Sequence, residues 1–131
     1  MVFGVFDRLH EGHRSFLVQA RAHGDELIAV VARDAVVQKL KGRAPHQSEE
    51  ERCARLEQVD EVKNVLLGDE EQGSYKVVTH HEPDIICVGY DQDELYRDLR
   101  KRMIQGTLPK IRLVRTRAYK PDEFHTSLLT D

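Results

Sequence analysis

His10 and His13 lie three residues apart and are the first residues of the chain whose types and spacing could support a chemical reaction. An apolar run precedes them at 1–6, and a helical pattern follows them at 14–20. The start of a helix attracts phosphate, because its backbone N–H groups are unpaired and its dipole is positive there. Gly12 would let a ligand approach the backbone, and imidazole N–H groups could stabilise charge that grows during a reaction. The pattern predicts a phosphate site, although two solvated loop histidines would have the same spacing.

A protein-bound metal fits these residues less well. Zinc needs three or four ligands at recurring spacings. The neighbouring carboxylate of Glu11 points to another side of a helical turn, and Cys53 and Cys87 lie far apart without a Cys-x-x-Cys partner. We therefore predict no metal ligand among the side chains.

Composition and charge describe one ordinary globular domain. The chain has 131 residues, of which 40% are hydrophobic and 33% charged, and its net charge is −3. This length supports one core, so we expect a single domain over 1–131. We expect a cytoplasmic protein, because no apolar run approaches the ~18 residues of a membrane span, no signal-peptide pattern opens the chain, and the two cysteines are unmatched. A negative net charge and the lack of a basic tail argue against nucleic acid as the partner.

Strand and helix patterns alternate along the whole chain. Short apolar runs predict strands at 1–6, 26–33, 62–68, 84–89 and 111–116, and longer periodic segments predict helices at 13–23, 48–59, 74–81 and 93–105. Ser48 and Glu51 form a capping box, and Gly24 stands where a left-handed C-cap belongs. This alternation predicts an α/β fold, a Rossmann-like doubly wound parallel sheet of about five strands that binds ligands at the carboxyl ends of its strands.

The loop expected after the second strand carries a basic cluster. Lys39, Lys41 and Arg43 lie close together around Gly42. A run of charge is commonly a solvated face, but this one follows a strand at the ligand-binding edge of a net-acidic protein. Arg presents a planar fork to phosphate, and Lys presents a mobile point charge. We therefore predict that the cluster binds phosphate, without ranking its three cations.

The histidines belong to a longer motif, Gly4-x-Phe6-Asp7-x-x-His10-x-Gly12-His13. This motif resembles the signature of the cytidylyltransferase-like nucleotidyltransferases, small enzymes with a Rossmann-like fold. The resemblance implies nucleotidyl transfer, in which a phosphate on an acceptor attacks the α-phosphorus of a nucleoside triphosphate and pyrophosphate leaves. Because the nucleophile is already an anion, catalysis would be mainly positioning and charge neutralisation, with Mg²⁺ held largely by the nucleotide.

The resemblance assigns roles to individual residues. His10, His13 and Lys41 are expected to act in catalysis, and Lys39 and Arg43 to contact the acceptor's phosphate. The residues expected to bind the nucleotide are Gly4, Val5, Phe6, Asp7, Gly12, Gly89, Asp91, Arg115, Thr126 and Ser127.

Some of these residues also have plainer interpretations. Gly89 and Asp91 could form a simple turn, although Asp91 could also accept from a ribose hydroxyl. The hydroxyls of Thr126 and Ser127 could be simple helix caps. Asp7 is expected to orient the histidine loop rather than to bind metal, and either Arg115 or Arg117 could reach the triphosphate. Val5 departs from the family pattern, which commonly has Thr or Ser there.

The remaining motifs resemble one subgroup, the archaeal-type FAD synthases, which transfer AMP from ATP to FMN. The matching segments are 25–34, 41–45, 50–52, 59–62, 67–68, 83–86, 89–92 and 124–127. The resemblance implies ATP rather than CTP as the nucleotide, FMN as the acceptor and a homodimer. A glycerol-3-phosphate-type cytidylyltransferase and a sugar-phosphate adenylyltransferase share these motifs and are alternatives. A non-catalytic nucleotide-binding sensor is an alternative of another class, but both histidines, the basic cluster and the hydroxyls are all present.

Overall fold

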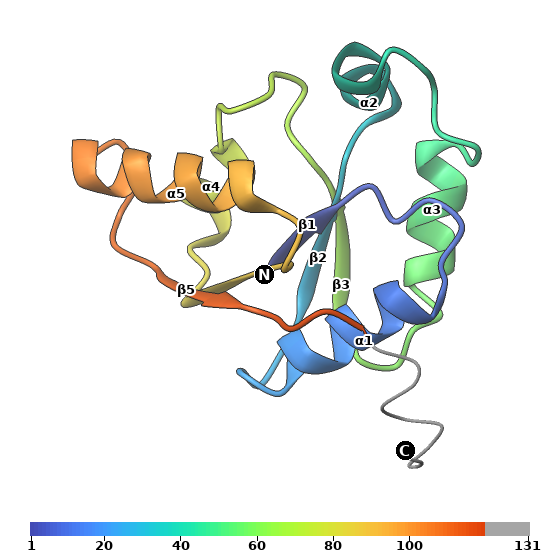
Figure 1. Ribbon diagram of the computed structural model, residues 1–131, viewed down its shortest axis with the longest axis horizontal. Helices are drawn as coiled ribbons and strands as arrows, with labels where there is room; N and C mark the ends of the chain where they lie inside the picture. Colours follow the sequence, from blue (N-terminus) through green and yellow to red (C-terminus); the bar gives the residue numbers. More distant parts are fainter. Residues whose placement is uncertain (120–131) are drawn as a thin grey trace.

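Strands and helices alternate in the computed structural model, which describes residues 1–119 (Figure 1). In chain order the elements are β1 (Val2–Gly4), α1 (Glu11–Arg21), β2 (Ile28–Val31), α2 (Asp34–Lys41), α3 (Glu49–Leu56), β3 (Asn64–Leu67), α4 (Lys76–His81), β4 (Ile85–Val88), α5 (Asp93–Gln105) and β5 (Arg112–Arg115). All five expected strands and all four expected helices are present, and α2 is an additional helix.

The strands form two parallel sheets that meet at β1 and β4. One sheet has the order β1-β2-β3 and the other pairs β4 with β5. Where they meet, the amino group of Met1 donates to the carbonyl of Ile85 at 2.8 Å, and the N–H of Cys87 donates to the carbonyl of Met1 at 3.0 Å. The five strands therefore lie in the order β3-β2-β1-β4-β5, and the direction of winding reverses between β1 and β4. The predicted Rossmann-like α/β fold is confirmed.

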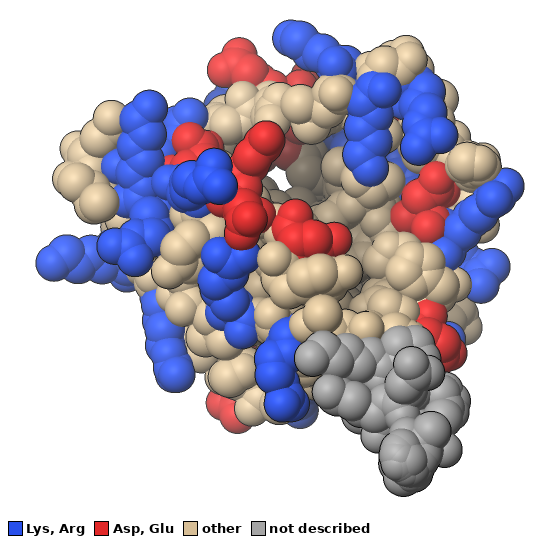
Figure 2. Space-filling model, viewed as in Figure 1, with Lys and Arg blue, Asp and Glu red and all other residues tan. Residues whose placement is uncertain are grey.

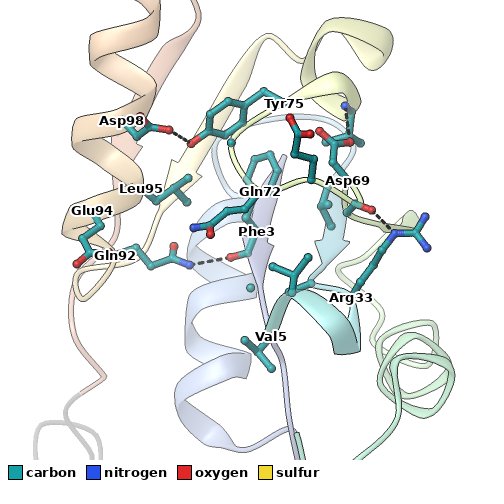
Figure 3. Close-up of a pocket in the computed structure, with 18 residues that line it drawn as sticks. Phe3, Val5, Arg33, Asp69, Gln72, Tyr75, Gln92, Glu94, Leu95 and Asp98 are labelled. Carbon is teal, nitrogen blue, oxygen red and sulfur yellow. Dashed lines mark hydrogen bonds between the residues drawn. The ribbon is translucent and has the colours of Figure 1, made fainter. Parts of the chain in front are cut away.

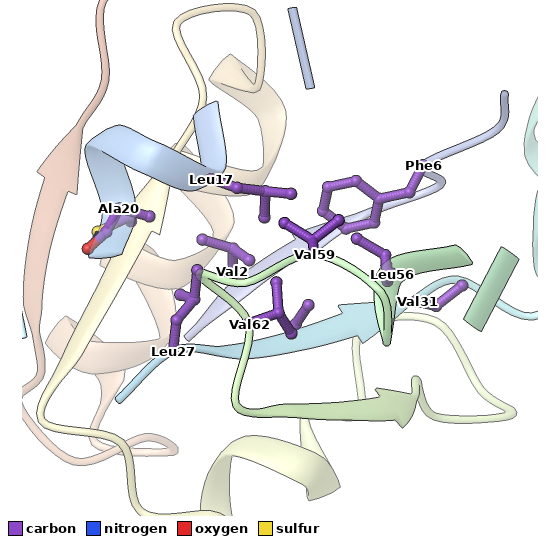
Figure 4. Packing of buried hydrophobic residues seen from close by; sticks show 11 residues of the cluster. Val2, Phe6, Leu17, Ala20, Leu27, Val31, Leu56, Val59 and Val62 are labelled. Carbon is purple, nitrogen blue, oxygen red and sulfur yellow. Dashed lines mark hydrogen bonds between the residues drawn. The ribbon is translucent and has the colours of Figure 1, made fainter. Parts of the chain in front are cut away.

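Helices cover both faces of the strands, because successive side chains of a strand point to opposite faces. On one face Val2 and Val31 pack with Leu17 of α1 and Leu56 of α3 (Figure 4). The opposite face packs against α4 and α5 through Val30, Ile86, Val88, Val78 and Leu99. Strands buried on both faces read as continuous apolar runs, which is why their positions could be predicted.

The segment after β2 corrects one expectation. We expected a loop carrying Lys39, Lys41 and Arg43, but 34–41 forms the helix α2. Val37 is buried on its inner side, the two lysines lie in the last turn where they complement the helix dipole, and Gly42 ends the helix in the left-handed conformation with φ 74°. Only Arg43 of the cluster lies in the following loop.

Both ends of the first helix also differ from expectation. The helix begins at Glu11 with His10 as its N-cap, two residues before the expected start. It ends at Arg21 with Ala22 in the right-handed conformation, and Gly24 is not left-handed. The last turn closes through N–H groups that donate to carbonyls three residues back, and Arg21 donates to the carbonyl of Gly24 at 2.6 Å. No left-handed cap is needed when a tightened turn satisfies the last carbonyls of the helix.

One arginine, Arg52 of α3, is fully buried and joins four segments. Its guanidinium donates to the carbonyls of Val5 at 2.9 Å, Ala32 at 2.8 Å and Gln47 at 3.0 Å. It also donates to the carboxylate of Asp34 at 2.6 Å, at the start of α2. The ends of β1 and β2 and the starts of α2 and α3 are therefore fixed relative to one another.

We expect Arg52→Met to lower the free energy of unfolding by about 3 kcal/mol. The change leaves three carbonyls and one carboxylate without their donor, and breaking a buried ion pair typically costs 3–5 kcal/mol; the lower figure applies because Asp34 is partly exposed. Urea titration followed by circular dichroism measures the loss. Arg55→Met, at an exposed position of the same helix, should cost less than about 1 kcal/mol, and equal losses in the two variants would contradict the role of Arg52.

Candidate active site

His10 and His13 together cap the N-terminus of α1. The Nδ1 of His10 accepts from the N–H of Gly12 at 3.1 Å, and the Nδ1 of His13 accepts from the N–H of His10 at 3.2 Å. The two rings stack with centroids 3.8 Å apart and planes 22° apart. This is a capping box built from imidazoles, in the positions where Ser and Glu commonly stand.

The capping bonds determine which nitrogen of each imidazole carries the proton. Because both Nδ1 atoms accept backbone N–H bonds, each neutral ring must carry its proton on Nε2. Burial and the neighbouring His10 lower the pKa of His13 to about 4, and Asp7 and Asp91 only partly oppose them. His13 is therefore neutral at pH 7, and both histidines present an Nε2–H donor beside the start of the helix.

The loop from β1 to the histidines is held in a strained backbone. Phe6 and Arg8 have positive φ values of 55° and 52°, which few residues other than glycine adopt. The ring of Phe6 is buried and lies edge-on to His13 at 5.8 Å, and the N–H of Arg8 donates to Gln47 at 3.0 Å. Contacts to the core and to the segment before α3 thus maintain a conformation that the loop alone would not favour.

Asp7 ties the same loop to the segment before α3. Its two oxygens accept the backbone N–H groups of His46 at 2.8 Å and Gln47 at 2.9 Å. Burial opposes ionisation of Asp7, but these backbone bonds and the nearby His46 and Arg52 outweigh it and lower the pKa. Asp7 therefore stays ionised, and its bonds to the backbone of 46–47 hold the loop.

Five of the residues expected to bind nucleotide meet at one hollow of about 120 Å³, here called the Gly89 hollow. They are Gly4, Phe6, Gly12, Gly89 and Asp91. A Cβ on Gly89 would lie 3.0 Å from an oxygen of Asp91 and 3.3 Å from one of Gln92. A side chain at position 89 would therefore displace these two side chains from the end of β4.

Three other expected nucleotide ligands lie elsewhere or beyond the described residues. Arg115 forms an ion pair with Asp93, donates to the carbonyl of Tyr90 and lies over the ring of Tyr96. It does not line the Gly89 hollow, whereas Arg117 does. The expected phosphate ligands Thr126 and Ser127 lie outside the described residues.

The basic cluster is only partly gathered at the site. Lys41 and Arg43 line a small hollow of about 80 Å³, here called the Lys41 hollow, together with Val5, Asp7 and His46. Lys39 is exposed on α2 and does not line this hollow. His46, for which the sequence gave no expected role, lies with its Nδ1 3.4 Å from the carboxylate of Asp7.

A third hollow lies on the other side of β1 and has a volume of about 440 Å³. We call it the Tyr75 cavity; its walls come from β1, the start of α2, the segment between β3 and α4, and α5. It shares Phe3, Gly4 and Gln92 with the Gly89 hollow, and Val5 with the Lys41 hollow. All three hollows therefore meet at the carboxyl end of β1.

Gln92 forms the partition between the two larger hollows. Its carbonyl oxygen accepts from the N–H of Gly89 and its amide donates to the carbonyl of Phe3, both at 2.8 Å. No role for Gln92 or Arg52 was expected from the sequence. The available signal for Arg52 was its spacing. It lies four residues before Leu56 and seven before Val59, on the apolar side of a helix.

Within residues 1–119, no group of three or more His, Cys, Asp or Glu side chains could hold a metal ion. None of the helices in this range has the length and apolar character needed to cross a membrane.

Comparison with known proteins agrees with this geometry. The sequence profile of the cytidylyltransferase-like family matches residues 1–128. An FAD synthase of Thermococcus sibiricus is 40% identical over 128 residues, which are 95% of this chain and 84% of the relative. An FAD synthase of Aciduliprofundum boonei is 42% identical over 123 residues, 91% of this chain and 78% of the relative.

A solved structure has a similar backbone fold as well. The crystal structure of the lipopolysaccharide core biosynthesis protein from Thermoplasma volcanium superposes with a TM-score of 0.82 at 35% identity, over 92% of this chain and 96% of the other. With a family profile that spans nearly its whole length and relatives of this similarity, the chain belongs to the cytidylyltransferase-like family and is a nucleotidyltransferase.

Proposed function

We propose that this protein is an FMN adenylyltransferase, an FAD synthase that transfers AMP from ATP to FMN. The observation that carries the proposal is the stacked pair of histidines at a helix N-terminus, on either side of Gly12, which lines the Gly89 hollow. Two substrates that approach from the two sides of Gly4 would bring their phosphates together at this point. The FAD synthase relatives support AMP and FMN as the groups that are joined.

In the proposed reaction an oxygen of the FMN phosphate attacks the α-phosphorus of ATP. A new P–O bond forms, the bond from the α-phosphorus to the bridging oxygen breaks, and pyrophosphate leaves. His10 and His13 donate to phosphate oxygens as charge develops, together with the N–H groups at the start of α1. Lys41 and Arg43 attract the phosphates from the Lys41 hollow. Mg²⁺ would enter with the triphosphate, neutralise part of its charge and keep most of its water.

The Gly89 hollow suits the nucleoside end of ATP. It combines backbone at Gly4, Gly12 and Gly89 with the carboxylate of Asp91, which can accept from ribose hydroxyls. Arg117 lines the same hollow and supplies a positive charge for the triphosphate. We also propose a homodimer, on the family resemblance.

A sugar-phosphate adenylyltransferase is the second candidate. Its specific support is the similarity in backbone to a protein described as acting in lipopolysaccharide core biosynthesis. The nucleotide side of the site would be the same, and only the acceptor would differ.

A pyrophosphate-release assay with Mg²⁺ tests the proposal by crossing ATP and CTP with FMN, glycerol 3-phosphate and a sugar 1-phosphate. We expect turnover with ATP and FMN, with FAD identified by chromatography. Turnover of ATP with the sugar 1-phosphate alone would favour the second candidate, and turnover of CTP would assign a cytidylyltransferase. Nucleotide binding without any turnover would favour a sensor.

His10→Ala and His13→Ala should each lower kcat by on the order of 10²–10³-fold, the effect of removing one preorganised donor to a developing charge. The Kd for ATP should change only a few-fold, because the donors act mainly in the transition state. Steady-state kinetics and calorimetry measure the two quantities. His80→Ala, at an exposed position of α4, is the control and should behave as the unmodified chain; a similar kcat in all four proteins would refute the catalytic role.

The lowered pKa of His13 predicts a pH-dependent stability. The unfolded chain takes up this proton near the ordinary value of 6.5 and the folded chain only near 4, so the folded state loses stability as the pH falls between these values. We expect the difference in unfolding free energy between the unmodified chain and His13→Gln to fall by about 1 kcal/mol from pH 7 to pH 4, a figure reduced for solvent screening of a partly exposed ring. Urea titrations at several pH values measure it, and a difference that stays constant would contradict the shift.

A further inference from the structure

The proposed reaction leaves one histidine beside the site, His46, without a role. It lines the Lys41 hollow together with Lys41 and Arg43, and about half of its side chain is exposed. Its backbone N–H donates to the carboxylate of Asp7 at 2.8 Å, and its Nδ1 lies 3.4 Å from the same oxygen. The ring is therefore carried on a fixed backbone among the basic residues, with a carboxylate next to one of its two nitrogens.

The three imidazoles differ in what a second proton would disrupt. The Nδ1 atoms of His10 and His13 accept backbone N–H bonds in the cap of α1, so a second proton on either ring would break a capping bond. The Nδ1 of His46 faces a carboxylate instead, which assigns the first proton to that nitrogen. The Nε2 of His46 has no hydrogen-bond partner among residues 1–119. His46 can therefore take up a second proton without losing a bond, and Asp7 stabilises the resulting cation.

The charges that line the Lys41 hollow favour such a cation. Asp7 is ionised and lines the hollow with Lys41 and Arg43, so it opposes the entry of a phosphate that the two basic residues attract. The buried Arg52 also acts on Asp7, but its own donors already have acceptors. A protonated His46 offsets the charge of Asp7 and adds a third positive group to the hollow.

The neighbouring Tyr75 cavity has the opposite charge. Asp69, Glu94 and Asp98 are among the four carboxylate side chains that line it, against one basic residue, Arg33 (Figure 3). Figure 2 shows Asp and Glu side chains around the hollow in the middle of this face, and Lys and Arg side chains over α2 and the segment after it. A phosphate is therefore attracted to the Lys41 hollow rather than to the Tyr75 cavity.

We propose that His46 is a phosphate-binding residue of the Lys41 hollow and carries a proton on both ring nitrogens when a phosphate is bound. The inference rests on the proposed function, since the phosphates are those of its two substrates. The Nδ1–H stays directed to Asp7, and the Nε2–H donates to a phosphate oxygen. The second proton comes from solvent, or from the phosphate itself when this arrives as a monoanion, so that a dianion and an imidazolium face each other. FMN and ATP both offer a phosphate of this chemistry, and the experiments below separate them.

NMR of the imidazole nitrogens tests the protonation. The ¹⁵N-labelled full chain is titrated at pH 7 with FMN and, separately, with ATP and Mg²⁺, and His46→Gln identifies the signals of His46. The two nitrogens of a neutral ring resonate far apart, whereas those of an imidazolium resonate close together. We expect one of the two ligands to bring the His46 signals together, while His10 and His13 each keep one unprotonated nitrogen. An unprotonated nitrogen in His46 at saturation with each ligand would overturn the proposal.

Affinity measurements test the contact itself. His46→Gln keeps the backbone N–H that donates to Asp7 but removes the ring, and it should raise the Kd of the ligand whose phosphate occupies the hollow about tenfold, as expected for the loss of a hydrogen bond between charged groups. A rise for FMN, followed by flavin fluorescence, assigns the acceptor's phosphate, and a rise for ATP, followed by calorimetry, assigns the triphosphate. His46→Arg keeps a positive charge and should restore most of the affinity, which a purely structural role would not predict.

A matched control and a check of folding accompany these variants. His23→Gln, at an exposed histidine after α1 that lines none of the three hollows, should leave both Kd values unchanged. Circular dichroism shows whether each variant is folded. An equal rise in His23→Gln and His46→Gln would contradict a specific contact of His46.

The outcomes separate this inference from the proposed function. FAD formation by the unmodified chain, with both affinities unchanged in folded His46→Gln, would overturn the role of His46 alone. Protonation of His46 on binding of ATP, without formation of FAD, would overturn the proposed function and support the role of His46.

Discussion

The active site depends on one cation that solvent does not reach. The guanidinium of Arg52 is fully buried, yet each of its three nitrogens has an acceptor. A buried charge is tolerated only when it is paired and hydrogen-bonded, and removal of one partner is costly. Because its acceptors lie at the ends of β1 and β2 and at the starts of two helices, the same bonds that satisfy Arg52 also fix the relative positions of the loops around the site.

The histidine loop gains its shape from this arrangement. Asp7 and Arg8 are bound to 46–47, and the carbonyl of Gln47 is in turn bound to Arg52. The two left-handed residues of the loop can persist because both ends are anchored. Strain in this loop thus lies next to the donors that must be held still, which is where preorganisation contributes most to stabilising a transition state.

Local signals predicted most of the fold and the centre of the site, whereas long-range contacts could not be predicted. Apolar runs located the strands, and the spacing of His10 and His13 pointed to the start of a helix, where the two rings form the cap of α1; their role in binding phosphate stays a prediction. The helix α2 was missed because its lysines were interpreted as a loop, although the helical spacing from Val36 and Val37 to Leu40 and the stop at Gly42 were visible. Arg52 bonds a carbonyl 47 residues away and Gln92 one 89 residues away, and nothing local in a single sequence indicates such partners.

One side of the site is formed mainly by backbone and the other mainly by side chains, and this difference decides which residues can vary. The side toward β4 relies on backbone at Gly4, Gly12 and Gly89, where any Cβ would intrude on neighbouring side chains. The side toward β3 relies on side chains from the β3–α4 segment and α5. Backbone features tolerate few substitutions, while side chains on a loop and one helix face can vary without disturbing the histidine pair. Because Gln92 bonds Gly89 and Phe3 between the two sides, side chains on the side toward β3 can change while the backbone toward β4 and the histidine pair keep their geometry.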